Sequence, residues 1–494
     1  PMLLTLPAVG LSGFLLFLCL LLVGFYLYCN GWTNVWVAVG VPGPRPWPFL
    51  LHVPEMMSGG LEQALEKWES VYGRTYGLHS LINRRPTLVT SDTRLLTRIL
   101  AEDFPNFLNR SPITFTNSTS LSSLFFSGGC DWRRAHHVMS PIFTGRKLRV
   151  MMRDVNDSAA CLVALVEGTR RRGDLVPLKK FMAKYTSDVI AKLGFGLRAK
   201  AVSGVDNEFF HNINNFLNIG TASQNLLRLV ALYFPALAKI GLDLFPSSDV
   251  INPKADAYFT RLARDALRKK REQKASEPRD MLDLLLQSET RQSTPGPSDK
   301  ALTSQEIVAN SVLLILSAFE TTSSTLRAVL YLLARHPDIQ DKVIQEVDTV
   351  LQGRRQPQYE DLASLKYTEQ VIKETLRLFP PAPAVTRQAE QTMRCGDVTI
   401  PKDSCVYIRI NRVLRDPGYW RDPDSFDPDR FSPGAGQTNT SDGIEFLVFG
   451  FGPRQCIGRR LAFLELKVVL CQLLTTFSHI SPHISHHRWC CVNS

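Results

Sequence analysis

The sequence predicts a mainly α-helical protein with small β-sheets, of the α+β class, preceded by an N-terminal apolar segment. No long low-complexity linker divides residues 50–480 of the 494-residue chain, so we expect one large domain there. Hydrophobic residues make up 44% of the chain, which is ample for a core of that size. The strand signals are short, at residues 87–90, 398–400 and 405–408.

Residues 2–29 are strongly apolar and carry no charge. The run exceeds the roughly 20 residues that span a bilayer, and aromatic residues follow its end as in an interfacial belt. A cleavable signal peptide is the alternative, but its apolar core has only about 7–15 residues and follows a basic segment. We therefore expect residues 1–30 to be a retained membrane anchor. Four prolines between Pro42 and Pro48 then predict a stiff, non-helical spacer at residues 41–48, within a proline-rich hinge at residues 31–50.

The formal net charge is 57 − 46 = +11. Basic residues stand in short clusters without an interleaved aromatic stripe, which argues against a nucleic-acid partner. The clusters are either solvated helix faces or a surface for an anionic membrane or an acidic redox partner. Ten cysteines form no regular framework, which is typical of a reducing compartment.

A long helix is predicted from residue 303 to 335. It opens with a capping box, Thr303 to Glu306, and ends at His336-Pro337. Its middle places Glu320 and Thr321 after a mostly apolar run that is too short to cross a membrane. Such polar groups are costly to bury unless they are paired or functional.

A shorter helix, residues 369–379, carries Glu374 and Arg377 on one face and ends at two prolines. On a surface, this pair would be worth less than about 1 kcal/mol. About 50 residues later, a second arginine, Arg430, lies in the run FDPDRF.

The most informative run is FGFGPRQCIG, residues 449–458, followed by an apolar-periodic helix at residues 459–474. The helix N-terminus, the cation of Arg454 and close backbone approach at glycines all favour Cys456 as a thiolate. A buried thiolate of this kind needs a cation, and heme iron is the obvious candidate. A structural cysteine in a glycine-rich turn is the alternative.

The spacing F-x-x-G-x-R-x-C-x-G resembles the cytochrome P450 family of heme-thiolate monooxygenases. The resemblance implies heme b, with Cys456 as the axial ligand of the iron. The run's other motif positions, Phe449, Gly452 and Gly458, would then belong to the cofactor-binding loop.

The other motifs acquire roles from the same resemblance. The long helix matches the family pattern A-G-x-[D/E]-T-T, which makes Glu320 and Thr321 the catalytic proton-handling pair, with departures at Ser317 and Ala318. Glu374, Arg377 and Arg430 would form a buried structural latch that fixes the loop leading to the cysteine.

The heme propionates need cationic or polar partners, and Arg454 is the first candidate. Residues 132–136 resemble the family's W-x-x-x-R helix, which implies that Trp132 and His136 also contact the cofactor. His136 replaces the family's arginine, and helical geometry points Arg133 and Arg134 elsewhere.

Three longer stretches, residues 140–144, 185–190 and 320–338, resemble the animal branch that contains the drug- and steroid-oxidising enzymes of family three. The implied function is insertion of one oxygen atom from O₂ into xenobiotics, steroids or fatty-acid derivatives. NADPH-cytochrome P450 reductase would supply the electrons, with cytochrome b5 as a further candidate partner. The implied location is the endoplasmic reticulum membrane, in a single pass, with the catalytic domain in the cytosol. The alternatives are a P450-like heme protein with impaired or no turnover, and an oxygen-independent peroxide isomerase.

The resemblance assigns residues 51–477 to the heme-binding monooxygenase domain. Residues 209–244, apolar and irregular, would roof its pocket. Residues 478–494 are an atypical C-terminal tail without the alternating strand pattern expected of the family.

Overall fold

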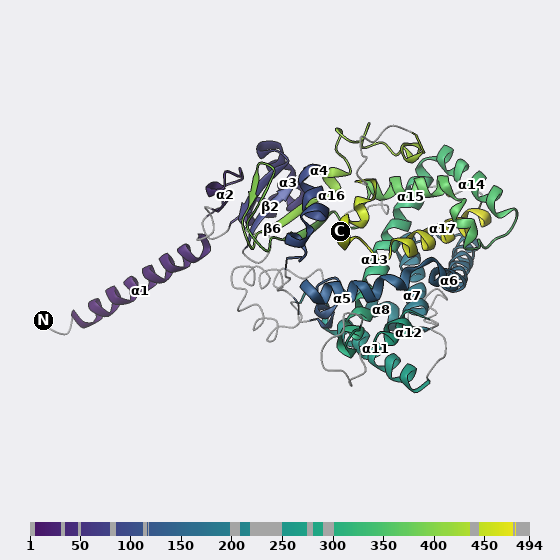
Figure 1. The fold of residues 1–494 in the computed structure, drawn as a ribbon, viewed down its shortest axis with the longest axis horizontal. Helices are drawn as coiled ribbons and strands as arrows, with labels where there is room; N and C mark the ends of the chain where they lie inside the picture. The colour runs from purple at the N-terminus through teal and green to yellow at the C-terminus, as the bar shows by residue number, and fades with distance from the viewer. Residues whose placement is uncertain are drawn as a thin grey trace. The chain divides into compact units, whose positions relative to one another are not determined.

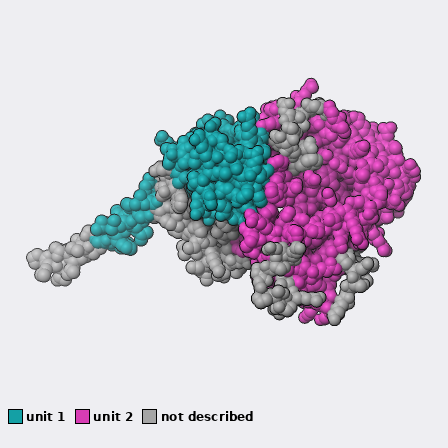
Figure 2. All heavy atoms as spheres, viewed as in Figure 1, with its two compact units in different colours: residues 1–115, 220–248, 384–409 teal, residues 116–219, 249–383, 410–494 magenta. Residues whose placement is uncertain are grey.

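The computed structural model describes residues 5–30, 35–47, 51–79, 85–111, 116, 118–197, 208–217, 249–273, 280–289, 301–434, 444–477 and 480. Most of the predicted pocket roof and nearly all of the C-terminal tail lie outside these residues. The chain divides into two compact units (Figure 2). Unit 1 comprises residues 1–115, 220–248 and 384–409, and unit 2 comprises the rest.

Unit 1 contains both sheets of the described chain, and strands β2 and β6 of the larger sheet are labelled in Figure 1. The first has the order β1-β2-β6-β3, in which β2 and β6 are parallel and the other neighbours are antiparallel. The second is the antiparallel pair β4-β5. The strands are β1 (Thr75–His79), β2 (Pro86–Thr90), β3 (Ala384–Gln388), β4 (Met393–Cys395), β5 (Val398–Ile400) and β6 (Cys405–Arg409). The three predicted strand segments correspond to β2, β5 and β6.

The helices of unit 1 are α1 (Thr5–Asn30), α2 (Val35–Ala38), α3 (Val53–Tyr72) and α4 (Thr93–Thr97), followed by single turns at Arg98–Glu102 and Phe104–Phe107. Helix α3 packs Leu65 and Trp68 against the β1-β2 hairpin. Gly77 of β1 is required because a Cβ there would lie 2.2 Å from Cγ of Trp36. The Trp36 indole also donates to the carbonyl oxygen of Leu78 at 2.9 Å, so α2 is fixed to the strand.

Helix α1 covers the predicted anchor, and its apolar side chains are exposed, with Phe14 at 61% and Leu20 at 62%. Within the predicted hinge, residues 41–46 have no regular structure, whereas Val35–Ala38 form the short helix α2.

Unit 2 is helical and holds the large core. Its helices are α5 (Gly129–Met139), α6 (Gly145–Arg171), α7 (Leu178–Phe195), α8 (Glu208–Asn214), α11 (Pro253–Gln273), α12 (Met281–Gln287), α13 (Ser304–Arg335), α14 (Pro337–Leu351), α15 (Lys366–Leu378), α16 (Ile410–Val413) and α17 (Arg459–Thr476). Short 3-10 turns lie at η3 (Thr119–Ser122), η4 (Ser140–Phe143), η7 (Glu360–Ala363), η8 (Pro428–Phe431), η9 (Ile444–Phe449) and η10 (Gly452–Arg454).

Helix α13 is the central element of this unit and contacts α7, α11, α15, α17 and η3. Both halves of the predicted capping box are present, because Thr303 accepts from the Glu306 amide and Glu306 accepts from the Thr303 amide. The helix ends at Arg335 with His336 as its C-cap, as predicted from His336-Pro337. Although the apolar run before Glu320 is too short to span a bilayer, the whole helix passes for a membrane span by length and composition. However, 67% of its most apolar stretch is buried inside the protein. We therefore assign it as a core helix.

Candidate functional site

The cysteine loop joins η9, η10 and α17. The amide of Cys456 donates to the carbonyl oxygen of Phe449 at 2.7 Å, which closes the loop. Gly450 and Gly452 have φ of 83° and 73°, a region that side chains disfavour. Cys456 itself is exposed, and no side chain caps the N-terminus of α17 behind it. The thiol therefore stands at the positive end of a helix, where a thiolate is stabilised.

A cationic and aromatic cluster lies in the same unit. The guanidinium of Arg454 is buried and lies 4.8 Å from the ring centroid of Trp132. The rings of Trp132 and His136 are 5.1 Å apart. Burial lowers the pKa of His136 from its ordinary value, and the charges of Arg454 and His137 lower it further. The structure therefore brings three predicted cofactor-binding residues together, namely Arg454, Trp132 and His136. Because the pKa of His136 is lowered, Arg454 is the only one of the three that carries a positive charge near neutral pH.

Arg134 points away from this cluster, as helical geometry predicts. Its Nη2 lies 2.6 Å from Oε1 of Glu306, and its Nη1 donates to Oε2 of the same residue at 2.9 Å. The pair joins α5 to the capping box of α13. Arg134 therefore does not replace the arginine that is missing at position 136.

A polar window interrupts the buried length of α13. Residues 307–315 before it are buried, and so are most of residues 322–326 after it, whereas Ser317, Glu320 and Thr321 are exposed. Thr321 Oγ1 donates to the carbonyl oxygen of Ser317 at 2.6 Å. Glu320 forms an ion pair with Arg327 at 3.4 Å. The two predicted catalytic residues thus share an open stretch of an otherwise buried helix.

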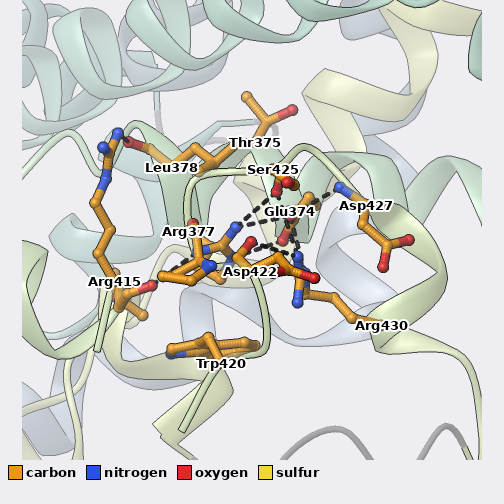
Figure 3. A network of polar contacts seen from close by, with 12 residues as sticks. Glu374, Thr375, Arg377, Leu378, Arg415, Trp420, Asp422, Ser425, Asp427 and Arg430 are labelled. Atoms are coloured by element: carbon orange, nitrogen blue, oxygen red, sulfur yellow. Dashed lines mark hydrogen bonds and ion pairs between the residues drawn. The ribbon is translucent and has the colours of Figure 1, made fainter. Parts of the chain in front are cut away.

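The latch residues meet in a buried network (Figure 3). Glu374 accepts from Nε of Arg377 at 2.7 Å and from Nε of Arg430 at 3.0 Å, and all three side chains are at most 1% exposed. Arg377 also donates to the carbonyl oxygens of Leu414, Pro423 and Ser425, and Arg430 to those of Arg421, Asp422 and Ser425. Two buried cations thereby hold the meandering segment between α16 and η8.

Several buried ionisable residues were not predicted from the sequence, among them Glu465 and Arg387. Glu465 on α17 is 2% exposed, and burial raises its pKa to about 8. Its position inside an apolar helical run is a signal that could have found it. In unit 1, burial and the charge of Arg110 lower the pKa of Arg387 to about 9. Nothing in the local sequence of β3 distinguishes that arginine from an exposed one.

The donor set in unit 2 fits a heme. A thiol at a helix N-terminus suits the iron, and a buried guanidinium stacked on an indole suits a carboxylate. These features fit the class of heme-thiolate proteins.

Comparisons with known proteins agree with this class. The family model of cytochrome P450 matches residues 41–488. The chain is similar to human cytochrome P450 3A5, with 31% identity over 94% of this chain and 90% of the relative. It is also similar to rat cytochrome P450 3A9, with 32% identity over 94% and 90%. The chain belongs to the cytochrome P450 family, and it is an oxidoreductase of the monooxygenase type that uses heme b, O₂ and NADPH-derived electrons.

Proposed function

We propose that this protein monooxygenates lipophilic small molecules, namely xenobiotics, steroids or fatty-acid derivatives, with electrons passed from NADPH-cytochrome P450 reductase. Cytochrome b5 is a second candidate donor. The observation that carries the proposal is the exposed thiol of Cys456 at the uncapped start of α17, in the same unit as the Arg454–Trp132–His136 cluster. The similarity to the 3A enzymes of human and rat supports the assignment.

When bound through Cys456, heme supplies the chemistry that reduces O₂ and transfers one oxygen atom. The chain's own residues bind, orient and move protons around it. Arg454 and Trp132 bind a heme carboxylate, and His136 contributes an aromatic surface. Thr321 Oγ1 already donates to Ser317, so its lone pairs accept from a water that delivers protons. Glu320, at the exposed edge of the same window, exchanges protons with solvent.

Glu374, Arg377 and Arg430 have a structural role in this proposal. Their network fixes the segment that leads into the cysteine loop, so heme retention depends on it. Phe449, Gly452 and Gly458 shape the loop itself. The ring of Phe449 lies 5.6 Å from that of Phe463 on α17, which supports a fixed loop.

The proposal includes a membrane location. Residues 1–30 form the anchor in a single pass, residues 31–50 the hinge, residues 51–477 the cytosolic catalytic domain and residues 478–494 the tail. The exposed apolar side chains of α1 support this, because an uncharged apolar helix of 26 residues is about 39 Å long. The endoplasmic reticulum is the expected membrane. Protease treatment of sealed microsomes should degrade the catalytic domain; full protection would place it in the lumen instead.

A carbon monoxide spectrum of the reduced protein tests thiolate ligation. The wild type should show the thiolate-type band, and Cys456→His should lose it. Unchanged spectra in the variant would refute the assignment of Cys456.

Product formation with purified reductase and NADPH then tests the reaction. We expect hydroxylated product from a steroid or fatty acid only with both present. Turnover of a peroxide without NADPH would favour the isomerase alternative. Heme binding without any turnover would favour a non-catalytic heme protein.

A further inference from the structure

A ten-residue segment, residues 118–127, runs between α11 and α13 and ends immediately before α5. It is called the 118–127 segment below. It contains η3, which packs against α13, and the adjacent rings of Phe125 and Phe126, whose centroids are 4.9 Å apart. Leu121 and Phe125 expose 38% and 42% of their surfaces. The segment therefore presents apolar groups rather than burying them all.

The start of the 118–127 segment is held by one carboxylate of α11. Asp256 Oδ1 accepts from Oγ of Ser118 at 2.7 Å, and Oδ2 accepts from the amide of Thr119 at 3.1 Å. Asp256 is only 9% exposed. Thr260, one turn later on α11, donates to Oγ1 of Thr119 at 3.2 Å. Hydrogen bonds to a buried carboxylate are among the stronger ones in proteins.

The rest of the segment is held by α13 and the cysteine loop. Asn310 is fully buried, and its Oδ1 accepts from the amide of Leu124 at 2.8 Å. Its amide nitrogen donates to the carbonyl oxygen of Glu306, which fixes the orientation of the side chain. At the far end, Arg454 donates to the carbonyl oxygen of Ser127. Side chains from three separate elements thus fix the segment at its start, middle and end.

The held segment lies on the functional face of α13. Ser317 and Thr321 lie 7 and 11 residues after Asn310, so all three residues share one face of the helix. The amide that Asn310 holds belongs to Leu124, the residue before Phe125. Phe125, whose side chain is exposed, therefore comes directly after a residue that is anchored to α13. The anchor, Asn310, lies about 10 Å along the helix axis from the polar window.

We propose that Asp256 is a positioning residue for substrate specificity. By holding Ser118 and Thr119, it sets where Leu121 and Phe125 stand relative to the polar window of α13, and so which apolar substrates fit. The inference rests on the proposed monooxygenase function. Asp256 does not touch substrate or heme; it acts through the 118–127 segment.

The test uses the full-length, heme-loaded protein and spectral titration of its ferric form with testosterone and lauric acid. In Asp256→Asn, one carboxylate oxygen becomes an amide NH2 group, which donates and cannot accept, so one of the two hydrogen bonds to Ser118 and Thr119 is lost and the start of the segment loosens. We expect the ratio of the two dissociation constants to change by about fivefold, the equivalent of one net hydrogen bond. The carbon monoxide spectrum and heme content should stay as in the wild type.

The matched control is Asp265→Asn. Asp265 lies on the same helix, but pairs with Arg268 at the surface, with both side chains about half exposed or more. This variant should leave both dissociation constants within twofold of the wild type. Ser118→Ala removes only one donor to Asp256 and should shift the ratio in the same direction, by less. It also keeps the test available if Asp256→Asn does not fold.

The outcomes separate the two hypotheses. If the wild type gives no thiolate-type spectrum, the proposed function fails before Asp256 is tested. If the wild type binds heme and both probes but Asp256→Asn and Ser118→Ala leave the ratio unchanged, the positioning role is wrong. An equal change in both dissociation constants also overturns it, because a merely structural loss weakens both probes alike.

Discussion

Nε of Arg377 lies 2.7 Å from Oε2 of Glu374, and neither side chain is more than 1% exposed. A second buried cation, Arg430, lies against the other oxygen of the same carboxylate. One anion therefore compensates two buried guanidinium groups, so its removal costs more than that of an ordinary ion-pair partner.

Glu374→Gln should lower the free energy of unfolding by about 3–5 kcal/mol, because it leaves buried charge uncompensated. Chemical denaturation and heme content measure this. The matched control is Glu360→Gln, whose partner Arg149 is 58% exposed and which is 62% exposed itself. That change should cost less than about 1 kcal/mol. Equal effects in both variants would contradict the latch.

Gly450→Ala should reduce heme incorporation. At φ of 83°, a side chain costs about 1–2 kcal/mol, and the new Cβ would also lie 3.3 Å from Cα of Gln455 in the cysteine loop. Gly396→Ala is the control, since Gly396 has φ of 62° with nothing within 4 Å of a Cβ. Heme-to-protein ratios after expression should fall in the first variant and remain normal in the second.

Glu465 should make stability depend on pH. Its folded pKa of about 8 lies above the ordinary value of 4.5, so the folded state binds more protons than the unfolded state between those values. The free energy of unfolding therefore falls as pH rises through this interval, by roughly 5 kcal/mol in total. Glu465→Gln should remove this fall in the free energy of unfolding, as measured by denaturation at pH 5, 7 and 9. Glu66→Gln, a change at an exposed position, should leave the pH dependence of the free energy of unfolding as in the wild type. A pH-independent wild type would count against a buried, protonated Glu465.

His136→Arg should slow heme loss. The pKa of His136 is lowered by burial and by the charges of Arg454 and His137, so near neutral pH it offers no cation to a heme carboxylate. A permanent guanidinium would add a charge-assisted hydrogen bond, worth about tenfold in the rate of heme transfer to apomyoglobin. His137→Arg, one residue along but exposed, should change the rate by less than twofold. Equal rates for wild type and His136→Arg would place the heme carboxylates elsewhere.

Local signals in the sequence were enough to predict α13, because Thr303, Glu306 and Pro337 mark its ends chemically. Strands β1, β3 and β4 were missed. β1 contains Gly77, and β3 pairs its Arg387 with Val406 of β6, so neither shows an alternating pattern that stands out locally. Their pairing depends on partners that the sequence alone does not identify.

The functional site also contains some residues that the sequence predicts and others that only the structure identifies. The family resemblance alone predicted a network of Glu374, Arg377 and Arg430. Asp256 and Asn310 belong to no motif, and their partners lie 138 and 186 residues away along the chain. Such contacts arise from the packing of helices on one another, and only the structure could identify them.

The parallel pair β2-β6 has a consequence for how the protein is made. Thr87 pairs with Cys405, so the strands are 405 − 87 = 318 residues apart in the chain. At about 5–20 residues per second, the ribosome needs roughly 16–64 s to deliver β6 after β2. During that interval the β1-β2 hairpin exposes an unpaired edge, which is a site for aggregation. A chaperone that covers residues 86–90 of the nascent chain should therefore raise the yield of folded protein more than one that acts after release.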